Sequence, residues 1–156
     1  MRCPTVVRAL AFIPIALSLG ACNDASKGQT LFHAALSAAN EVPARDTGAN
    51  GAAGFTVDGD RVLYSIEANQ IGNITMSHIH SGAEGVNGPV RVFLFRGPTT
   101  GTVNGRLVEG SFTAADVTGI SFEELLAEMQ AGTAYVNVHT TQFPAGEMRG
   151  QTQLVR

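Results

Sequence analysis

The sequence predicts an all-β fold, an antiparallel β-sandwich or barrel with one short helix. Short runs rich in β-branched and aromatic residues recur along the chain and are separated by glycine-rich turns, which is the pattern of a sandwich or barrel. The pair Asp58-Gly59 stands between two such runs, 54–57 and 61–67, and this arrangement indicates a β-hairpin. One segment, 121–129, has the spacing of a helix instead.

The other elements are expected in chain order. The first strand is the apolar run 31–36, and turn-forming residues then gather in 39–50, which we expect to be a loop. After the hairpin, further strands are expected at 74–80, 89–95, 106–112, 134–139 and 147–155. Glycine-rich turns join these short strands, so neighbouring strands are expected to run antiparallel.

The helical segment carries its own start and stop signals. Its apolar residues recur at helical spacing: Phe122, Leu125, Leu126 and Met129. Ser121 and Glu124 form a capping box at its start, and Gly132 can end it in a left-handed conformation. Its glutamates are expected on the solvated face.

The N-terminus reads as a secretory leader. Arg2 and Arg8 are followed by an apolar run, 9–19, that is far shorter than the roughly 20 residues of a spanning helix. The run ends in Leu19-Gly20-Ala21-Cys22, which resembles the bacterial lipobox, whose cysteine becomes lipid-modified. We therefore predict a leader at 1–21, a lipidated Cys22 in a tether at 22–30, and one folded domain at 31–156. The alternative is an ordinary secreted protein that is cleaved near Cys22.

The predicted anchor would hold the protein at a bacterial cell envelope, with the membrane as its first partner. Asn23, rather than aspartate, follows the cysteine, which resembles the pattern sent onward to the outer membrane, facing the periplasm or the exterior. Removal of Arg2 and Arg8 with the leader lowers the formal net charge from −3 to −5. A chain without a basic patch is not expected to bind nucleic acid. Cys3 leaves with the leader, so no internal disulfide is expected.

Two segments carry the candidate chemistry. His78 and His80 alternate with Ile79, and His139 alternates with Val138 in 134–139. Side chains of a strand alternate between its faces. The imidazoles are therefore expected on one polar face outside the core, provided that the two strands are neighbours.

Three imidazoles on one face favour a metal ion, with copper preferred over zinc. The alternative is a polar ladder, in which His78 bonds Asn137 or a backbone carbonyl. Glu147 and Arg149 share a strand face, as an ion pair or cross-strand partners, or else with Glu147 orienting a histidine and Arg149 attracting an anion. His33 stands alone and is expected to be structural.

Three blocks of the sequence resemble the CHRD family, the domain named from chordin. They are 36–43, the stretch 78–90 with its His-Ile-His-Ser-Gly start, and 135–151 with Tyr135-Val136-Asn137-Val138-His139. The resemblance spans Leu31 to Leu154 and implies an immunoglobulin-like β-sandwich. It implies no settled activity, although chordin itself is a growth-factor antagonist.

A looser resemblance is to the copper/zinc superoxide dismutases. His78, His80 and His139 match copper ligands there, and Arg149 stands where an anion-guiding arginine is expected. The bridging histidine, the zinc subsite and the disulfide cysteines are missing. Three functions are carried forward: an envelope binding module that holds copper, a copper-dependent redox enzyme, and a metal-free module that docks another envelope protein. The sequence leaves the oligomeric state open.

Overall fold

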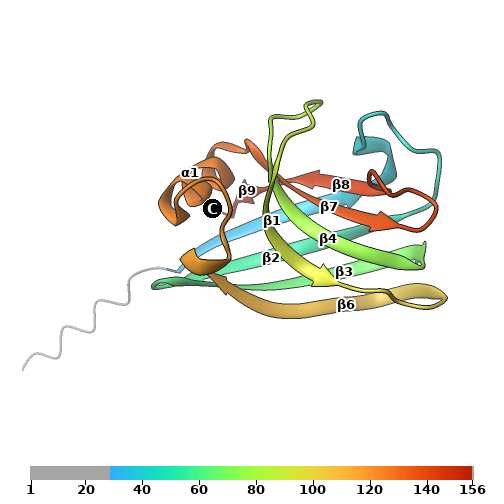
Figure 1. Cartoon of the computed structure of the whole chain (residues 1–156), viewed down its shortest axis with the longest axis horizontal. Coiled ribbons are helices and arrows are strands. Elements are labelled where there is room, and N and C mark those ends of the chain that lie inside the picture. Colours follow the sequence, from blue (N-terminus) through green and yellow to red (C-terminus); the bar gives the residue numbers. More distant parts are fainter. Residues whose placement is uncertain (1–28, 156) are drawn as a thin grey trace, which may run out of the picture.

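The computed structural model describes residues 29–155. This part of the chain confirms the all-β prediction, because its nine strands form one antiparallel sheet that nearly closes into a barrel (Figure 1). The strand order is β5-β4-β7-β8-β1-β2-β3-β6, with β9 paired to β1. The predicted leader, most of the tether and Cys22 lie outside the described residues.

The strands and the helix have the following bounds. The strands are β1 Thr30–Ser37, β2 Asn50–Asp58, β3 Arg61–Gly72, β4 Ile74–Ser81, β5 Val90–Arg96, β6 Thr102–Thr113, β7 Ala134–Thr140, β8 Met148–Gln151 and β9 Gln153–Leu154. The helix α1 is Phe122–Ala131, and two 3-10 turns, η1 and η2, are Ala38–Asn40 and Ala114–Asp116.

The hairpin between β2 and β3 forms as predicted, with Asp58 opposite Arg61 and Gly59 at a φ of 63°. Strand β2, however, starts at Asn50, several residues before the run expected from the sequence. After Asn50 the strand begins with Gly51-Ala52-Ala53-Gly54, and glycine and alanine have low strand propensity. Here the backbones approach closely: a Cβ on Gly51 would lie 2.1 Å from the carbonyl oxygen of Glu67. Small residues are therefore needed at the start of β2, although such residues do not predict a strand.

The C-terminal run was predicted as one strand and is two. Thr152 separates β8 from β9, and its hydroxyl donates to the backbone carbonyls of Met129 and Ala134. Its N–H also donates to the Ala134 carbonyl. Thr152 thus interrupts the strand, because it bonds to the carbonyls at the end of α1 and the start of β7.

The helix α1 confirms its sequence signals. Ser121 and Glu124 make the capping box, and Gly132 closes the helix at a φ of 71°. Phe122, Leu125 and Met129 are buried against the sheet at one end of the barrel (Figure 1). No helix in residues 29–155 has the length and apolar character needed to cross a membrane.

The strands β4, β7 and β8 lie side by side and position the candidate site. Their inward side chains, among them Ile79, Val136, Val138 and Met148, are fully buried in the core. The outward face of these three strands carries the histidines.

Candidate metal centre

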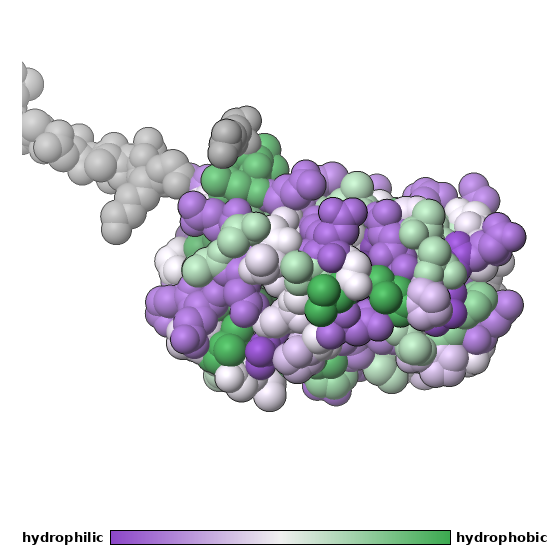
Figure 2. Space-filling model, turned by 90° about the horizontal axis from the view of Figure 1, so that it is seen from above, coloured by the Kyte–Doolittle hydropathy of each residue, from purple (hydrophilic) through white to green (hydrophobic). Residues whose placement is uncertain are grey.

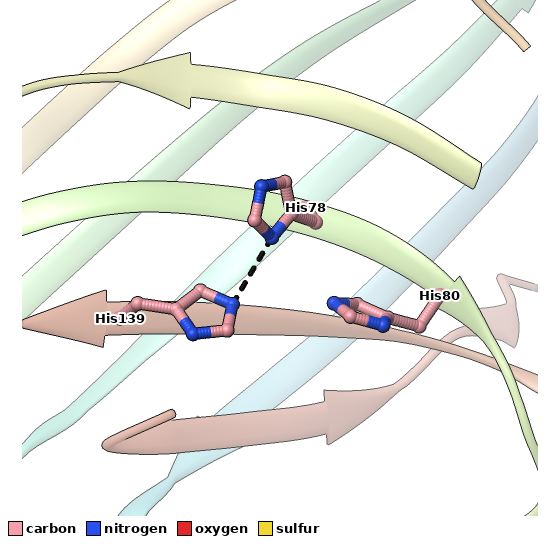
Figure 3. A group of neighbouring side chains, drawn as sticks. All are labelled: His78, His80 and His139. Atoms are coloured by element: carbon pink, nitrogen blue, oxygen red, sulfur yellow. Dashed lines mark hydrogen bonds between the residues drawn. The ribbon is translucent and has the colours of Figure 1, made fainter. Parts of the chain in front are cut away.

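The structure brings His78, His80 and His139 together, as expected from the sequence. In the pairing of β4 with β7, His78 lies opposite Asn137 and His80 lies opposite Tyr135, while His139 lies two residues further along β7. The three side chains leave the same face of the sheet and point toward one another (Figure 3). One nitrogen from each ring can be chosen so that all three lie within 4.8 Å of one another. We call these residues the histidine cluster.

The cluster lies outside the core on the predicted face, but loops cover this face. His78, His80 and His139 are only 3%, 8% and 7% exposed. The loop between β4 and β5 and the turn between β7 and β8 fold over the sheet and supply the carbonyls of Gly88 and Pro144 to the imidazoles. A strand pattern predicts which way a side chain points, whereas its exposure here depends on loops that carry no periodic signal.

Two of the imidazoles are fixed in orientation by these carbonyls. The Nδ1 of His80 lies 2.9 Å from the Gly88 oxygen, and the Nδ1 of His139 lies 3.0 Å from the Pro144 oxygen. Because a carbonyl can only accept, each Nδ1 must carry the hydrogen and donate. Each Nε2 of the neutral rings therefore keeps its lone pair. Backbone carbonyls orient metal-binding histidines in this same way.

The third imidazole, that of His78, forms a hydrogen bond to His139. Its Nδ1 lies 3.0 Å from the Nε2 of His139, so in the neutral cluster His78 donates and His139 accepts. The Nε2 atoms of His78 and His80 are buried without a hydrogen-bond partner. Buried polar atoms usually have partners, and two unpartnered nitrogens in one cluster indicate a candidate site for a ligand.

The surroundings keep the cluster uncharged. The pKa of His78 is lowered to about 3, mainly by burial and also by His139, His80 and Arg96. Burial also lowers the pKa of His80 and of His139, although the Gly88 and Pro144 carbonyls act in the opposite direction. Neutral imidazoles are the form that binds metal. The cluster is thus ready to ligate without first losing protons at neutral pH.

The geometry of the cluster suits a small ion. Two imidazole nitrogens on one tetrahedral ion, each at about 2.0–2.1 Å, lie about 3.3 Å apart. The 3.0 Å between His78 Nδ1 and His139 Nε2 is close to this separation, and His78 Nδ1 can ligate once its hydrogen has moved to Nε2 of the same ring. Three imidazoles suit copper or zinc.

A family comparison gives this site its context. The model of the CHRD domain matches residues 32–152, which includes all three histidines and the strands that carry them. The chain belongs to the CHRD domain family. No curated protein and no solved structure matches the chain, so the looser similarity to superoxide dismutases gained no support. Membership of this family supports a binding module, and it names no metal and no reaction.

In this CHRD domain, Arg149 is a buried brace. Its side chain is 1% exposed, and its guanidinium lies 3.4 Å from the centre of the Tyr135 ring. It donates to the carbonyls of Ala83 and Val86 and to side-chain oxygens of Asn87 and Gln151. The guanidinium therefore holds the loop between β4 and β5 in place, and most of its hydrogens are already used there.

Arg149 also supports the histidine cluster indirectly, through the ring of Tyr135. Tyr135 lies between the Arg149 guanidinium and the His80 ring, which stacks on it at 4.9 Å with an interplanar angle of 11°. The Tyr135 hydroxyl accepts from the N–H of Gly88, whose carbonyl orients His80. Strand alternation places Tyr135 on the same face as His139, but it does not indicate that the ring stacks on His80.

Glu147 and Asn137 do not make the contacts predicted from the sequence. The Glu147 carboxylate accepts from the Thr140 hydroxyl at 2.7 Å. Asn137 lies opposite His78, and its Oδ1 is buried without a partner. Glu41 is close by: a Cβ on Gly146 would meet Asn137 Oδ1 at 2.5 Å and Glu41 Oε1 at 2.7 Å.

Glu41 belongs to the segment 39–50 that was expected to be a loop, and the sequence did not indicate its buried position. Its side chain is 5% exposed, its Oε1 lacks a partner, and burial raises its pKa. Burial thus favours the uncharged form of this carboxyl group, which lies close to Asn137. The only signal in the sequence was its place in the block 36–43. His33, in contrast, lies exposed on β1 and apart from the cluster.

Proposed function

We propose that this CHRD domain is a binding module that holds a copper ion at the histidine cluster. The observation that carries the proposal is the fixed orientation of His80 and His139, whose Nε2 lone pairs converge beside His78 (Figure 3). A ladder of hydrogen-bonded histidines would use all its nitrogens. This cluster instead leaves two of them buried and unpartnered.

Copper is preferred to zinc for reasons of chemistry and supply. No cysteine occurs in residues 29–155, so thiolates do not compete for the ion. For a site of nitrogen ligands, copper binds more tightly than zinc at equal availability. The three imidazoles are neutral, so the bound ion would keep its positive charge.

The test is metal binding by protein that carries no histidine tag. We expect one copper ion per chain, measured by titration and elemental analysis, with affinity lowered by at least about 100-fold in His139→Ala. The matched control is His33→Ala, which removes an exposed histidine from β1 and should leave the affinity unchanged. Equal copper binding by the wild type and His139→Ala would contradict the site.

The proposed location is the cell envelope, through a lipid on Cys22. The arginines, apolar run and small residues that precede Cys22 support it. Membrane fractionation of the Cys22→Ser variant tests it, because this variant should move to the soluble fraction. Unchanged membrane association would contradict lipid anchoring without affecting the metal proposal.

A redox enzyme at the same cluster is the second candidate, and one observation gives it a new test. Arg96 is exposed, its guanidinium lies 3.7 Å from the centre of the Phe93 ring, and Phe93 contacts His78 edge-on at 4.4 Å. Arg96 is therefore better placed than the buried Arg149 to attract an anion. If the copper-loaded protein dismutates superoxide, Arg96→Glu should slow turnover, with a smaller loss at high salt. A pure binding module should show no turnover above free copper.

The third candidate, a metal-free docking module, has less support. On the face seen in Figure 2, apolar patches are small and are separated by hydrophilic residues. Docking surfaces of soluble proteins usually show a larger continuous apolar area.

A further inference from the structure

One side of the histidine cluster is bordered by a methionine. Met76 lies directly opposite His139 in the pairing of β4 with β7, and it precedes His78 by two residues on the same strand. Directly opposite residues of an antiparallel pair have Cβ atoms about 4.5–5.5 Å apart. Residues two apart on one face are separated by about 7 Å. The Met76 side chain therefore starts about one side-chain length from His139 and somewhat farther from His78.

The other sides of the cluster are already occupied. Phe93 covers His78 from β5, and Tyr135 covers His80. The Pro144 carbonyl lies against His139 from the turn before β8. Met76 is 38% exposed, whereas the three imidazoles beside it are buried. Apolar side chains are usually buried and polar ones exposed, but here the methionine is exposed and the imidazoles are buried.

A thioether has distinctive coordination chemistry. It is a soft, uncharged ligand on a flexible side chain, and it favours Cu(I) over harder ions such as Zn²⁺ or Co²⁺. Three imidazoles and one thioether make a four-coordinate set without a negative charge. Such a set suits a monovalent ion, because a divalent ion would keep more uncompensated charge in a buried site.

We infer that Met76 is the fourth ligand of the cluster and makes it a site for monovalent copper. The inference rests on the proposed function, because it takes the three histidines as ligands and names the ion that they hold. Met76 moves from its exposed position onto the ion and covers it from solvent. No oxidation or reduction is part of this binding step.

The experiment compares a soft ion with a hard one in the same variants. Ag⁺ serves as a redox-inert substitute for Cu(I), and Co²⁺ serves as a spectroscopic probe of the three imidazoles. Met76→Leu keeps the size of the side chain and removes the sulfur. The matched control is Leu63→Met, which places a thioether at a 43% exposed position on β3, away from β4 and β7. Thermal unfolding of each apo variant confirms that the domain is folded.

We expect Met76→Leu to weaken Ag⁺ binding at least tenfold, which is about 1.4 kcal/mol, while Co²⁺ affinity stays within about twofold. Leu63→Met should change neither affinity by more than this. In the Cu(I)-loaded wild type, X-ray absorption should require one sulfur neighbour, and Met76→Leu should require none.

The other outcomes separate the two proposals. Unchanged Ag⁺ binding in Met76→Leu would overturn the methionine ligand and leave the three-histidine site intact. An equal loss of Ag⁺ and Co²⁺ would also overturn it, since Met76 would then only cover the site. If the wild type bound neither ion, the proposed function itself would fail.

Discussion

Strands β7 and β6 belong to the same sheet but have different surroundings. All seven residues of β7 are buried, polar ones included, whereas β6 alternates between exposed and partly buried positions over most of its length. The difference comes from the loops. The loop between β4 and β5 and the turn before β8 cover the outward face of β7, whereas alternate side chains of β6 are exposed. Polar residues on β7 therefore need internal partners, and those on β6 have water.

The largest effect should follow from removing the brace under the covering loop. Arg149→Ala deletes hydrogen bonds to two backbone carbonyls and the stack on Tyr135. Leaving buried acceptors without donors costs about 1–3 kcal/mol each, and we expect a loss of about 3 kcal/mol or more in the free energy of unfolding. Chemical denaturation measures it. A loss below about 1 kcal/mol would mean that the loop holds without the arginine.

The second effect concerns the loop backbone itself. A Cβ on Gly88 would lie 1.7 Å from the Ser81 carbonyl oxygen, so Gly88→Ala must displace the loop and the carbonyl that orients His80. We expect a loss of about 2–3 kcal/mol, together with weaker metal binding. The control is Gly54→Ala on β2, where the nearest atom would be 3.7 Å away. Equal stability of the two variants would contradict a tightly fitted loop.

The third effect is a loss of stability in acid, in the apo protein. The pKa of His78 falls from 6.5 to about 3 on folding, so the unfolded chain binds its proton first. Stability is then fully present above pH 6.5 and is lost as the pH falls toward 3. Between pH 7 and pH 5, His78 alone should cost about 2 kcal/mol.

The control for this acid effect is His78→Leu, which cannot titrate. Its free energy of unfolding should depend less on pH over the same window. If both proteins lose stability equally, the acid effect arises elsewhere.

The smallest effect should come from the uncovered strand. Arg106 and Glu109 form an ion pair at 2.6 Å on β6, with side chains 59% and 58% exposed. Exposed pairs contribute about 0–1 kcal/mol, so Arg106→Ala should change stability by less than about 0.5 kcal/mol. Set against Arg149→Ala, it measures directly what covering a strand does to an arginine. A large loss here would show that position in the sheet, rather than covering, decides the cost.

The sequence was sufficient for those parts of the site that depend on strand period. His78, His80 and His139 share a face because alternation fixes direction, and Asn137 and Tyr135 follow the same rule. The burial of that face could not be predicted, because it depends on where the loop after Ser81 folds back. The early start of β2 was missed for a related reason: Gly51 is required by a backbone that becomes its neighbour only in the sheet.

Glu41 and Arg149 were harder still. Both were interpreted from their local sequence, Glu41 as a loop residue and Arg149 as part of a strand face. Their surroundings come from segments far away in the chain, such as Gly146 beside Glu41 and Ala83 above Arg149. Side-chain networks of this kind have no short-range pattern.

The hydrogen bond between His78 and His139 joins residues 61 positions apart. An ion bound there would cross-link the middle of the chain to its C-terminal part in a domain whose described residues contain no cysteine. A covalent link closing a loop of that length restricts the unfolded chain by about 4 kcal/mol on the chain-entropy scale used for disulfides. A bound ion would be a reversible cross-link, so the stability of the folded domain would depend on the concentration of the metal.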